Sequence, residues 1–585
     1  MAVTFTNKAA TELKERILNN ASGYNLSNAF IGTFHSICVR LLRIYGKSMD
    51  FDNYTIIDPA DSRKIIKHLL EKRGISLKGN EIDTILDKIS ELKNIFVTPQ
   101  DFLPKAKTKD DRRMAAAYHD YVQYCRQNKV MDFDDIILNM VTLLERDLSV
   151  RQRITNRFKH IMIDEAQDTS LSQHRLINLM IDQNNLFMVG DIDQSLYGWR
   201  NAKPQYLAQF QTVYPNGQIL ELKKNYRSTG MIVKAASGLI QNNLMRYAKE
   251  METDRPDGEK VYVCEFPNPK AEASTIAQNI HILKNKRGYE YKDFVIIYRT
   301  KAQSRIFEDN LIKHNVPYKI VNGVQFYERM EIKDLLSYMR VIANPDDNLA
   351  LARILEKVPR VGKKTIATLL DEAEKTKQSL FSVISGISGG SQAKDNIKDF
   401  VSTIIDIQNN IIANKMKISE IIEHIINKFD YYSLLPNDET IDERIENIEE
   451  FIRKGVEFDQ ELGDDERTLQ SFIEKLTLSS DQDDVDDDNT VKLMTGHTAK
   501  GLEFKVVFIV NAVEGIMPHE KSFGDPTRME EERRIFFVAM TRAEDLLFIS
   551  YSNVAQDIKG TRYLQKPSRY IDELPKECIK FKQMR

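Results

Sequence analysis

Residues 161–170 read IMIDEAQDTS, and this stretch indicates the fold class. The apolar run Ile161–Ile163 has the length of a buried strand and ends at two adjacent acids, Asp164 and Glu165. A polar or glycine-containing turn and a helical pattern follow it, and the same holds for Met1–Phe5, Leu186–Val189, Phe294–Ile297, Val491–Met494, Val506–Val510 and Leu546–Ser550. This alternation predicts an α/β fold of parallel sheets with helices on both faces. In such sheets the functional loops lie at the carboxyl ends of the strands.

Two long segments depart from this alternation. The first runs from about Asp50 to Met131 and the second from about Pro345 to Ser480; both are charged and 3.6-periodic, with few strand signals. We expect both to be helical insertions within sheet domains. The second ends at DQDDVDDD, residues 481–488, where the carboxylates repel one another. A solvated hinge or loop and a mimic of nucleic acid are both compatible with this acidic run.

The composition is that of a globular protein with several domains. Of the 585 residues, 42% are hydrophobic and 29% are charged. The 83 basic and 86 acidic side chains give a net charge of −3. This balance argues against a protein that coats nucleic acid by bulk charge, but it permits a local basic groove.

Neither a membrane protein nor a secreted protein is predicted. No apolar run approaches the roughly 18 residues of a membrane span. The polar residues Asn7, Lys8 and Glu12 interrupt the N-terminal stretch, which therefore does not resemble a secretory signal. The four cysteines are far apart and form no CxxC pair, so neither a disulfide framework nor a zinc site is indicated. We expect a cytoplasmic location.

The acids that follow Ile163 have the order found in nucleotide hydrolases. In such an enzyme the first acid, here Asp164, holds Mg²⁺ through a water molecule. The second, here Glu165, polarises the attacking water. A plain acidic turn after a strand is the alternative interpretation.

A second strand ends in polar and aromatic residues, in FMVGDIDQSLYGWR at positions 187–200. The amide of Gln194 can both donate and accept a hydrogen bond, which suits a sensor of a terminal phosphate. Tyr197 and Trp199 flank a glycine, and Arg200 follows. Trp199, the sole tryptophan, is either a core aromatic or an exposed platform on which bases stack, and its polar neighbours favour the platform.

Two segments carry an arginine suited to phosphate. In LKKNYRST, residues 222–229, Tyr226 can stack on adenine while Arg227 reaches a phosphate. In EERRIFFVAMTRAEDLLFIS, residues 531–550, a helix carries Arg542. An arginine brought to the terminal phosphate from another domain makes hydrolysis depend on closure. For either arginine, a surface ion pair is the alternative.

The segment VKLMTGHTAKGLEFKVVFI, residues 491–509, reads as strand, polar loop and strand. Thr495, His497 and Lys500 in the loop are suited to contact a DNA backbone. Glu503 is suited to accept a hydrogen bond from a ribose hydroxyl.

Nine segments in order resemble the UvrD/Rep/PcrA family of superfamily 1 DNA helicases. They are AVTFTNKAA (2–10), GTFHSICVRLLR (32–43), IDEAQDTS (163–170), GDIDQSLYGWRNAKP (190–204), NYRST (225–229), YRTKAQSR (298–305), FYERMEIKDLLSYMR (326–340), TGHTAKGLEF (495–504) and AMTRAEDLL (539–547). The resemblance covers nearly the whole chain. It implies two RecA-like domains, each with an inserted helical subdomain. It further implies that ATP binds between these domains and that translocation on single-stranded DNA runs from 3′ to 5′.

The resemblance also implies a role for each matching residue. Asp164 would be the Mg²⁺ acid and Glu165 the catalytic acid. Gln194, Arg227 and Arg542 would contact the γ-phosphate, while Tyr226 and Glu503 would serve the nucleotide. The implied DNA path comprises Phe5, His35, Tyr197, Trp199, Arg200, Thr495, His497 and His519. For His35 and His497, a satisfied core histidine is the alternative.

The implied cofactors are ATP and Mg²⁺, and the implied partners are single-stranded DNA and junctions of single-stranded with duplex DNA. The family acts in DNA repair and replication. We expect a monomer in isolation and no membrane partner. The expected segments are 1–48, 131–225 (first RecA-like domain), 49–130 (its insertion), 226–344, 489–585 (second RecA-like domain) and 345–488 (its insertion).

The sequence departs from the family pattern at the phosphate-binding loop. No GxxxxGK[ST] pattern precedes the strand that begins the chain, so the first RecA-like domain is expected to be N-terminally truncated. Gly362-Lys363-Lys364-Thr365 lacks the first glycine and reads as a turn or helix start in the second insertion. Lys301 stands where many relatives carry a DNA-contacting asparagine. We therefore expect a helicase of this type whose given chain is deficient in ATP hydrolysis, or else a non-enzymatic DNA-binding remnant.

Overall fold

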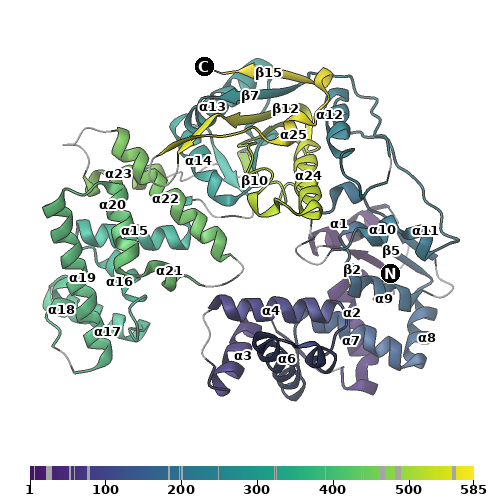
Figure 1. Ribbon diagram of the computed structural model, residues 1–585, viewed down its shortest axis with the longest axis horizontal. Helices are drawn as coiled ribbons and strands as arrows, with labels where there is room; N and C mark the ends of the chain where they lie inside the picture. The colour runs from purple at the N-terminus through teal and green to yellow at the C-terminus, as the bar shows by residue number, and fades with distance from the viewer. Residues whose placement is uncertain are drawn as a thin grey trace. The chain divides into compact units, whose positions relative to one another are not determined.

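A computed structural model describes residues 1–5, 7–20, 29–51, 54–57, 59–75, 79–181, 185–196, 198, 202–247, 249–321, 323, 326–388, 390–436, 438, 440–461, 468–480, 489–556 and 561–584. The chain divides into two compact units, shown in Figure 1. Unit 1 comprises Met1–Lys223 and Asn243–Glu250, and unit 2 comprises Lys224–Asn242 and Met251–Arg585.

Unit 1 contains the first sheet, whose strands lie in the order β2-β1-β5-β6. Their bounds are β1 (Ala2–Thr4), β2 (Ile31–Thr33), β5 (His160–Ile163) and β6 (Asn185–Met188). Every pairing recorded among these described strands is parallel. Val3 lies opposite both Gly32 and Ile163, and Ile163 lies opposite Met188. The carboxyl ends of strands that are distant in the sequence therefore meet at one edge.

Met162 and Phe187 of the first sheet are 49% and 57% exposed, so the amphipathic helices beside this sheet cover it only in part. They are α1 (Asn7–Asn20), α2 (Phe34–Tyr45), α7 (Phe133–Arg146), α8 (Leu148–Arg157), α9 (Leu171–Met180), α10 (Gln205–Ala208) and α11 (Phe210–Val213). Helix α7 shows why such a helix forms. The Asp132 carboxylate accepts from the Asp135 N–H at 2.8 Å in a capping box, which satisfies a donor of the first turn. Met140 and Leu144 on its apolar face are fully buried in the core of unit 1.

A helical insertion interrupts the first sheet between β2 and β5. It contains α3 (Pro59–Lys72), α4 (Gly79–Asn94), α5 (Pro99–Phe102) and α6 (Lys109–Gln127). These helices have a hydrophobic core of their own around Ile66, Ile89 and Tyr121. The short parallel strands β3 (Thr55–Ile56) and β4 (Val130–Met131) pair where the chain enters and leaves the insertion.

Unit 2 contains the second sheet, ordered β15-β7-β12-β11-β8-β10-β9. Its strands are β7 (Val261–Phe266), β8 (Phe294–Tyr298), β9 (Tyr318–Ile320), β10 (Val491–Thr495), β11 (Phe504–Ile509), β12 (Ala543–Ser552) and β15 (Ile579–Gln583). All pairings recorded among these strands are parallel. The interior strand β8 is buried along its whole length, as expected for a parallel strand covered on both faces.

The helices beside the second sheet are α12 (Gly230–Ile240), α13 (Pro269–Arg287), α14 (Ser304–Lys313), α24 (Pro526–Met540) and α25 (Arg569–Asp572). The bounds of α13 follow from its sequence. The Asn268 side chain accepts from the Ala271 N–H, Pro269 occupies the first turn, and Gly288 ends the helix at φ 74°.

The insertion of unit 2 is larger and entirely helical in its described part. It contains α15 (Met330–Ala343), α16 (Asn348–Leu355), α17 (Lys363–Thr376), α18 (Leu380–Ser385), α19 (Gln392–Asn414), α20 (Ile418–Lys428), α21 (Tyr431–Leu434), α22 (Ile441–Glu461) and α23 (Leu469–Ser480). Its core is rich in isoleucine, including Ile354, Ile404 and Ile422.

The remaining elements are short. An antiparallel hairpin joins β13 (Val554–Gln556) and β14 (Arg562–Leu564). The 3₁₀ turns are η1 (Gly46–Met49), η2 (Leu103–Lys105), η3 (Ala166–Asp168), η4 (Ile192–Gln194), η6 (Tyr291–Asp293), η7 (Lys301–Gln303), η8 (Phe326–Glu328), η9 (Glu520–Ser522) and η10 (Lys576–Cys578). Among the described residues, no helix combines the length and apolarity needed to cross a membrane.

The predicted fold class is confirmed: each unit has a parallel sheet and an inserted helical part. All seven apolar runs named in the sequence form strands, with ends that differ by a few residues. Strands β2, β7, β9 and β15 were not predicted. In strand β15, Ile579 and Phe581 alternate with Lys580 and Lys582, and β2 has three residues, so neither gives the apolar run on which the prediction relied.

Candidate functional site

The carboxyl end of β5 presents the two predicted acids. Asp164 is exposed, and its Oδ1 accepts a hydrogen bond from the Glu165 N–H at 2.9 Å. Glu165 is half-buried and adopts the left-handed conformation at φ 51°, ψ 41°. A non-glycine residue in this region is uncommon, and such residues cluster at functional sites. The backbone therefore turns sharply after the strand and separates the two carboxylates.

Gln167 is a functional candidate that the sequence interpretation missed. It is fully buried, and its Nε2 donates to Glu165 Oε2 at 2.5 Å. Its Oε1 accepts from the Asp191 N–H at 2.9 Å, so it joins the loops after β5 and β6. A Cβ on Gly190 would lie 2.5 Å from that Oε1, so this close approach requires glycine. The sequence signal that could have identified Gln167 is its amide side chain within DEAQD, residues 164–168.

The loop after β6 places Gln194 in a charged network. Gln194 Nε2 donates to Asp191 Oδ2 at 2.9 Å. Lys249 pairs with Asp191, and Arg246 pairs with the buried Asp193 at 3.0 Å. The basic partners come from Asn243–Glu250, which belongs to unit 1 although it follows α12 of unit 2 in sequence. Gln194 thus lies at the same sheet edge as Glu165, one strand away.

The structure places Phe5 and His35 at this same edge of the first sheet. Phe5 follows β1, and the Asp164 N–H donates to Val3 O at 2.9 Å, so Phe5 and the acids follow neighbouring strands. His35 is the second residue of α2, directly after β2. It is half-buried and packs edge-on against Phe133 with 5.8 Å between ring centroids. Burial lowers the pKa of His35, which favours the neutral ring at neutral pH.

Three residues of the predicted DNA path, Tyr197, Trp199 and Arg200, lie outside the described residues. Their roles stay predictions from the sequence.

In unit 2 the two predicted phosphate-binding arginines, Arg227 and Arg542, both bind Thr541 and one of residues 502–503. Arg227 Nε donates to Glu503 Oε2 at 2.7 Å, and its Nη1 donates to Thr541 O at 3.1 Å. Arg542 is 2% exposed and donates from Nη1 to Leu502 O at 3.1 Å, from Nε to Val538 O at 2.9 Å and from Nη2 to Thr541 Oγ1 at 3.1 Å. Both guanidinium groups are thus held by acceptors of unit 2. A phosphate that engaged Arg542 would have to replace some of these bonds.

Tyr226 has the exposure of a stacking platform. It is 77% exposed, and the Lys224 ammonium lies 5.5 Å from the centre of its ring. An exposed aromatic next to Arg227 is consistent with the predicted contact to adenine.

Two predicted DNA-contacting histidines surround an ion pair that the sequence did not reveal. Arg299, at the end of β8, binds Glu532 of α24 through Nε at 3.0 Å and Nη2 at 2.6 Å. Glu532 also accepts from the His519 N–H at 3.0 Å. Burial and the nearby Arg299 charge lower the pKa of His497 to about 4, and both causes also lower that of His519. His519 Nδ1 accepts from the Lys521 N–H at 3.2 Å, which assigns its ring proton to Nε2.

The other polar groups of this edge are also engaged. Thr495 Oγ1 accepts from the Thr498 N–H at 3.3 Å and caps the turn after β10. Lys301 Nζ lies 3.1 Å from Glu443 of α22. Lys301 therefore has a partner in the insertion.

The carboxylates after β5 fit Mg²⁺. This cation prefers hard oxygen ligands and is commonly held by one or two carboxylates together with substrate phosphates. Asp164 offers an exposed carboxylate at the strand end, with Glu165 next to it. No group of three or more potential metal-binding side chains occurs among the described residues, so phosphate and water would complete the coordination.

Neither glycine-lysine segment has the setting of a phosphate-binding loop. Gly46-Lys47-Ser48, which the sequence interpretation overlooked, forms η1 after α2, and Ser48 Oγ donates to Asp147 Oδ2 at 2.9 Å. Gly362 is the N-cap of α17 within the helical insertion and follows no strand. The loop requires a strand before it and a helix after it.

Comparison with known proteins gives matches over both units. The family model described as the UvrD/REP helicase N-terminal domain matches residues 1–215, and that of the UvrD-like helicase C-terminal domain matches residues 220–554. An ATP-dependent DNA helicase PcrA from Staphylococcus epidermidis is 37% identical over 588 aligned residues, which cover 99% of this chain and 80% of the relative. A PcrA from Staphylococcus aureus has the same identity and coverage.

Two parallel α/β units with helical insertions, and polar groups at the carboxyl ends of their strands, define a protein of the RecA-like motor class. The chain belongs to the UvrD/Rep/PcrA family of helicases. The family resemblance predicted from the nine motifs is thereby confirmed.

Proposed function

We propose that this protein is an ATP-dependent DNA helicase that translocates from 3′ to 5′ on single-stranded DNA and acts at junctions with duplex DNA in repair or replication. One observation carries the proposal: Asp164, Glu165 and Gln194 lie at the ends of neighbouring strands, and Gln167 connects their loops. The PcrA relatives are named ATP-dependent DNA helicases, which supports both the use of ATP and the action on DNA.

The proposed chemistry assigns each side chain a task. Asp164 holds Mg²⁺, which neutralises phosphate charge when bound. Glu165 takes up the proton of the attacking water, and Gln167 fixes the Glu165 carboxylate through the 2.5 Å hydrogen bond. Gln194 senses the γ-phosphate.

Unit 2 supplies positive charge and the contacts to adenine and ribose in the same proposal. Arg227 and Arg542 stabilise the charge that develops on the transferred phosphoryl group. Tyr226 stacks on the base, and Glu503 accepts from a ribose hydroxyl. Arg227 and Arg542 bind different atoms of Thr541 and the neighbouring residues Glu503 and Leu502, so their engagement with phosphate would affect the same part of unit 2.

DNA is proposed to contact both units. In unit 1 the contacts are Phe5, His35, Tyr197, Trp199 and Arg200. In unit 2 they are Thr495, His497 and His519. Since both unit 2 histidines are neutral at neutral pH, they would donate ordinary hydrogen bonds to phosphate rather than salt bridges.

We propose further that the 585 residues by themselves hydrolyse ATP slowly. The printed sequence contains no GxxxxGK[ST] pattern, whose backbone N–H groups and lysine cradle the phosphates. We keep the segments predicted from the sequence, except that α15 shares the core of the second insertion and Asn243–Glu250 belongs to unit 1. A reducing cytoplasmic setting is supported by the four cysteines, which are free and buried.

The test compares two proteins. The first is the purified 585-residue chain, for which we expect tight binding of oligo-dT but little DNA-stimulated ATP hydrolysis. The second is an N-terminally extended chain that supplies a strand–GxxxxGK[ST]–helix unit, for which we expect stimulated hydrolysis and unwinding. Normal turnover by the first protein would disprove the deficiency. DNA binding without hydrolysis in both proteins would favour a non-enzymatic DNA-binding protein.

A further inference from the structure

A cavity in unit 2 opens at the carboxyl ends of three strands of the second sheet. Its volume is about 670 Å³, within the roughly 300–1,000 Å³ typical of ligand sites. Pro267, Asn511 and Val554 line it, and they follow the ends of β7, β11 and β12. Parallel α/β sheets bind ligands at this edge. None of the residues proposed above for ATP, Mg²⁺ or DNA is among those that line the cavity.

One wall of the cavity is apolar and aromatic. Tyr563 and Leu564 of β14 face the cavity together with Ile306 of α14 and Val456 of α22. Tyr563 is 48% exposed, so part of its ring is accessible. A flat ligand can stack on such a ring, whatever its detailed identity.

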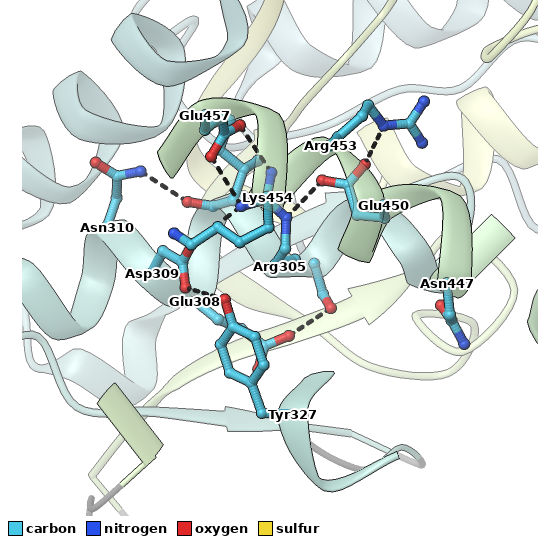
Figure 2. Close-up of polar contacts among 12 residues, drawn as sticks. Arg305, Glu308, Asp309, Asn310, Tyr327, Asn447, Glu450, Arg453, Lys454 and Glu457 are labelled. Atoms are coloured by element: carbon cyan, nitrogen blue, oxygen red, sulfur yellow. Dashed lines mark hydrogen bonds and ion pairs between the residues drawn. The ribbon is translucent and has the colours of Figure 1, made fainter. Parts of the chain in front are cut away.

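The acids that line the cavity are already neutralised. Figure 2 shows the buried Arg305 guanidinium between two glutamates of α22: Nε binds Glu450 Oε1 at 2.7 Å and Nη2 binds Glu457 Oε1 at 2.9 Å. Arg305 also binds Asp309 at 3.1 Å, and Lys454 binds Asp309 at 2.6 Å. The floor of the cavity therefore does not repel an anion as two free carboxylates would.

Several donors at the cavity have no partner recorded among the described residues. Arg453 donates from Nε to Glu450 Oε2 at 2.7 Å, while its two terminal nitrogens point away from Arg305 and are unengaged (Figure 2). Arg562 of β14 is exposed and has no recorded partner. Gln303 Nε2 is buried without a hydrogen bond, although its Oε1 accepts from the Arg299 and Thr300 N–H groups. Gln303 Nε2 is closed off from solvent, so of these three side chains only Arg453 and Arg562 offer accessible donors to the cavity.

The strand-end wall of the cavity is held in place from behind. Glu272 is fully buried, and its Oε1 accepts from the Asn511 N–H at 3.0 Å and from Ser550 Oγ at 2.5 Å. These bonds support Asn511 in its left-handed conformation at φ 53°. The wall is thus preorganised rather than a gap between loosely packed loops.

We propose that this cavity binds a nucleotide unit, with the base between Tyr563 and the apolar wall and the phosphate at Arg453 and Arg562. The ligand needs a planar apolar part and an anionic part at once, and a nucleotide provides both. Its source can be a free mononucleotide or one nucleotide of a DNA strand. This site goes beyond the proposed ATP and DNA contacts, since it shares no residue with them.

The experiment uses one tryptophan as a local probe in the full chain. Trp199 is replaced by Phe, and Tyr563→Trp places the sole tryptophan in the cavity wall. We expect thymidine monophosphate to quench its emission with a saturable isotherm, because the base stacks on the ring. Leu564→Trp, at a position that is 83% exposed, is a second probe should Tyr563→Trp disturb the hairpin.

The controls distinguish binding at this cavity from nonspecific attraction to basic side chains elsewhere on the protein. Arg453→Gln and Arg562→Gln should each weaken binding about tenfold, the effect of one lost charge-assisted hydrogen bond. Arg287→Gln, at the far end of α13, should leave it unchanged. Displacement of the mononucleotide by an oligo-dT of about ten nucleotides identifies a DNA strand as the source. Persistence of the bound mononucleotide identifies free nucleotide.

Two outcomes overturn the proposal. One is unchanged emission at millimolar thymidine monophosphate from both probes in folded protein, with folding checked by circular dichroism. The other is quenching that Arg453→Gln and Arg562→Gln do not weaken. ATP hydrolysis is not measured, so failure of the proposed helicase activity leaves this test intact.

Discussion

The functional edges of the two sheets differ in how accessible their proposed catalytic side chains are. At the first sheet Asp164 is exposed and Glu165 is half-buried, so acceptors are available to water, metal or ligand. At the second sheet Arg542 is 2% exposed and its donors are bound to three acceptors of its own unit. A group that activates water must be accessible to it. An arginine that senses phosphate can instead bind acceptors of the protein until the phosphate of a ligand replaces them. The comparison predicts that mutations at the first edge change chemistry alone, while those at the second also change stability.

Glu165→Gln should give the largest effect. In the N-terminally extended chain we expect ATP hydrolysis to fall by about a thousandfold or more, because water activation is removed, while ATP affinity stays nearly constant. Stability should change little, since the glutamine amide keeps an oxygen that can accept from Gln167 Nε2. Single-turnover hydrolysis and equilibrium nucleotide binding measure the two parts.

Glu145→Gln is the matched control, because Glu145 is an acid of the same unit that pairs with Arg175 on the helical surface. It should leave hydrolysis unaltered. A collapse of ATP affinity in Glu165→Gln with residual turnover preserved would contradict the assignment of Glu165 as the catalytic acid.

Arg542→Ala should change both activity and stability. Loss of the phosphate contact predicts about a hundredfold slower hydrolysis. Three buried acceptors would also lose their donor, which predicts a loss of roughly 2–4 kcal/mol in the free energy of unfolding. Arg227→Ala, at a more exposed arginine with the same proposed role, should lose only about 1 kcal/mol. Urea unfolding of the two variants compares them, and equal losses would remove the distinction between the two arginines.

Trp199→Ala tests the DNA contact proposed for Trp199. We expect single-stranded DNA to bind more weakly by about 1–3 kcal/mol, the range for one lost base stack. In the unaltered chain, oligo-dT should quench the emission of this sole tryptophan, and binding should weaken with added salt. DNA binding with unchanged emission would place Trp199 in the core instead.

Glu272→Gln should change stability in a pH-dependent way. Burial raises the pKa of Glu272 to about 7 from its usual 4.5. Between these values the folded protein keeps a proton that the unfolded chain releases, so the free energy of unfolding falls as pH rises. The slope from this group is up to about 1.4 kcal/mol per pH unit. Subtracting the variant's urea-unfolding profile from that of the unaltered chain should show this slope from about pH 4.5 to pH 7, and a flat difference would contradict it.

Much of the fold could be predicted from local patterns. The apolar runs that precede Asp164 and His497 became strands β5 and β10. In β5, Ile161 and Ile163 are buried while Met162 is 49% exposed, so this apolar run forms a strand without burial on both faces. The helical insertions followed from 3.6-residue periodicity. Strand β15 has no such run, and its pairing with β7 depends on contacts between segments far apart in the chain.

The site was predicted in its motif residues but not in their partners. Asp164, Gln194 and Arg227 stand in recognisable sequence motifs, so they could be predicted without the fold. The link from Gln167 to the Asp191 N–H depends on how β5 and β6 align, which no local pattern states. The pair of Arg299 with Glu532 spans 233 residues and likewise requires the fold. Tyr197, Trp199 and Arg200 lie outside the described residues, so their places stay predictions.

The insertions of the two sheets have a consequence for the order in which the chain folds. Strand β8 pairs with β10, and β1 pairs with β5, in each case across a complete helical insertion. Contacts within the insertions are local and form quickly, whereas pairing across such separations is slow. During synthesis β8, with its apolar segment Phe294–Tyr298, leaves the ribosome long before β10 exists to cover it. Until then an unpaired apolar strand edge is open to association with other chains, so we expect the nascent chain to be prone to aggregation at this stage.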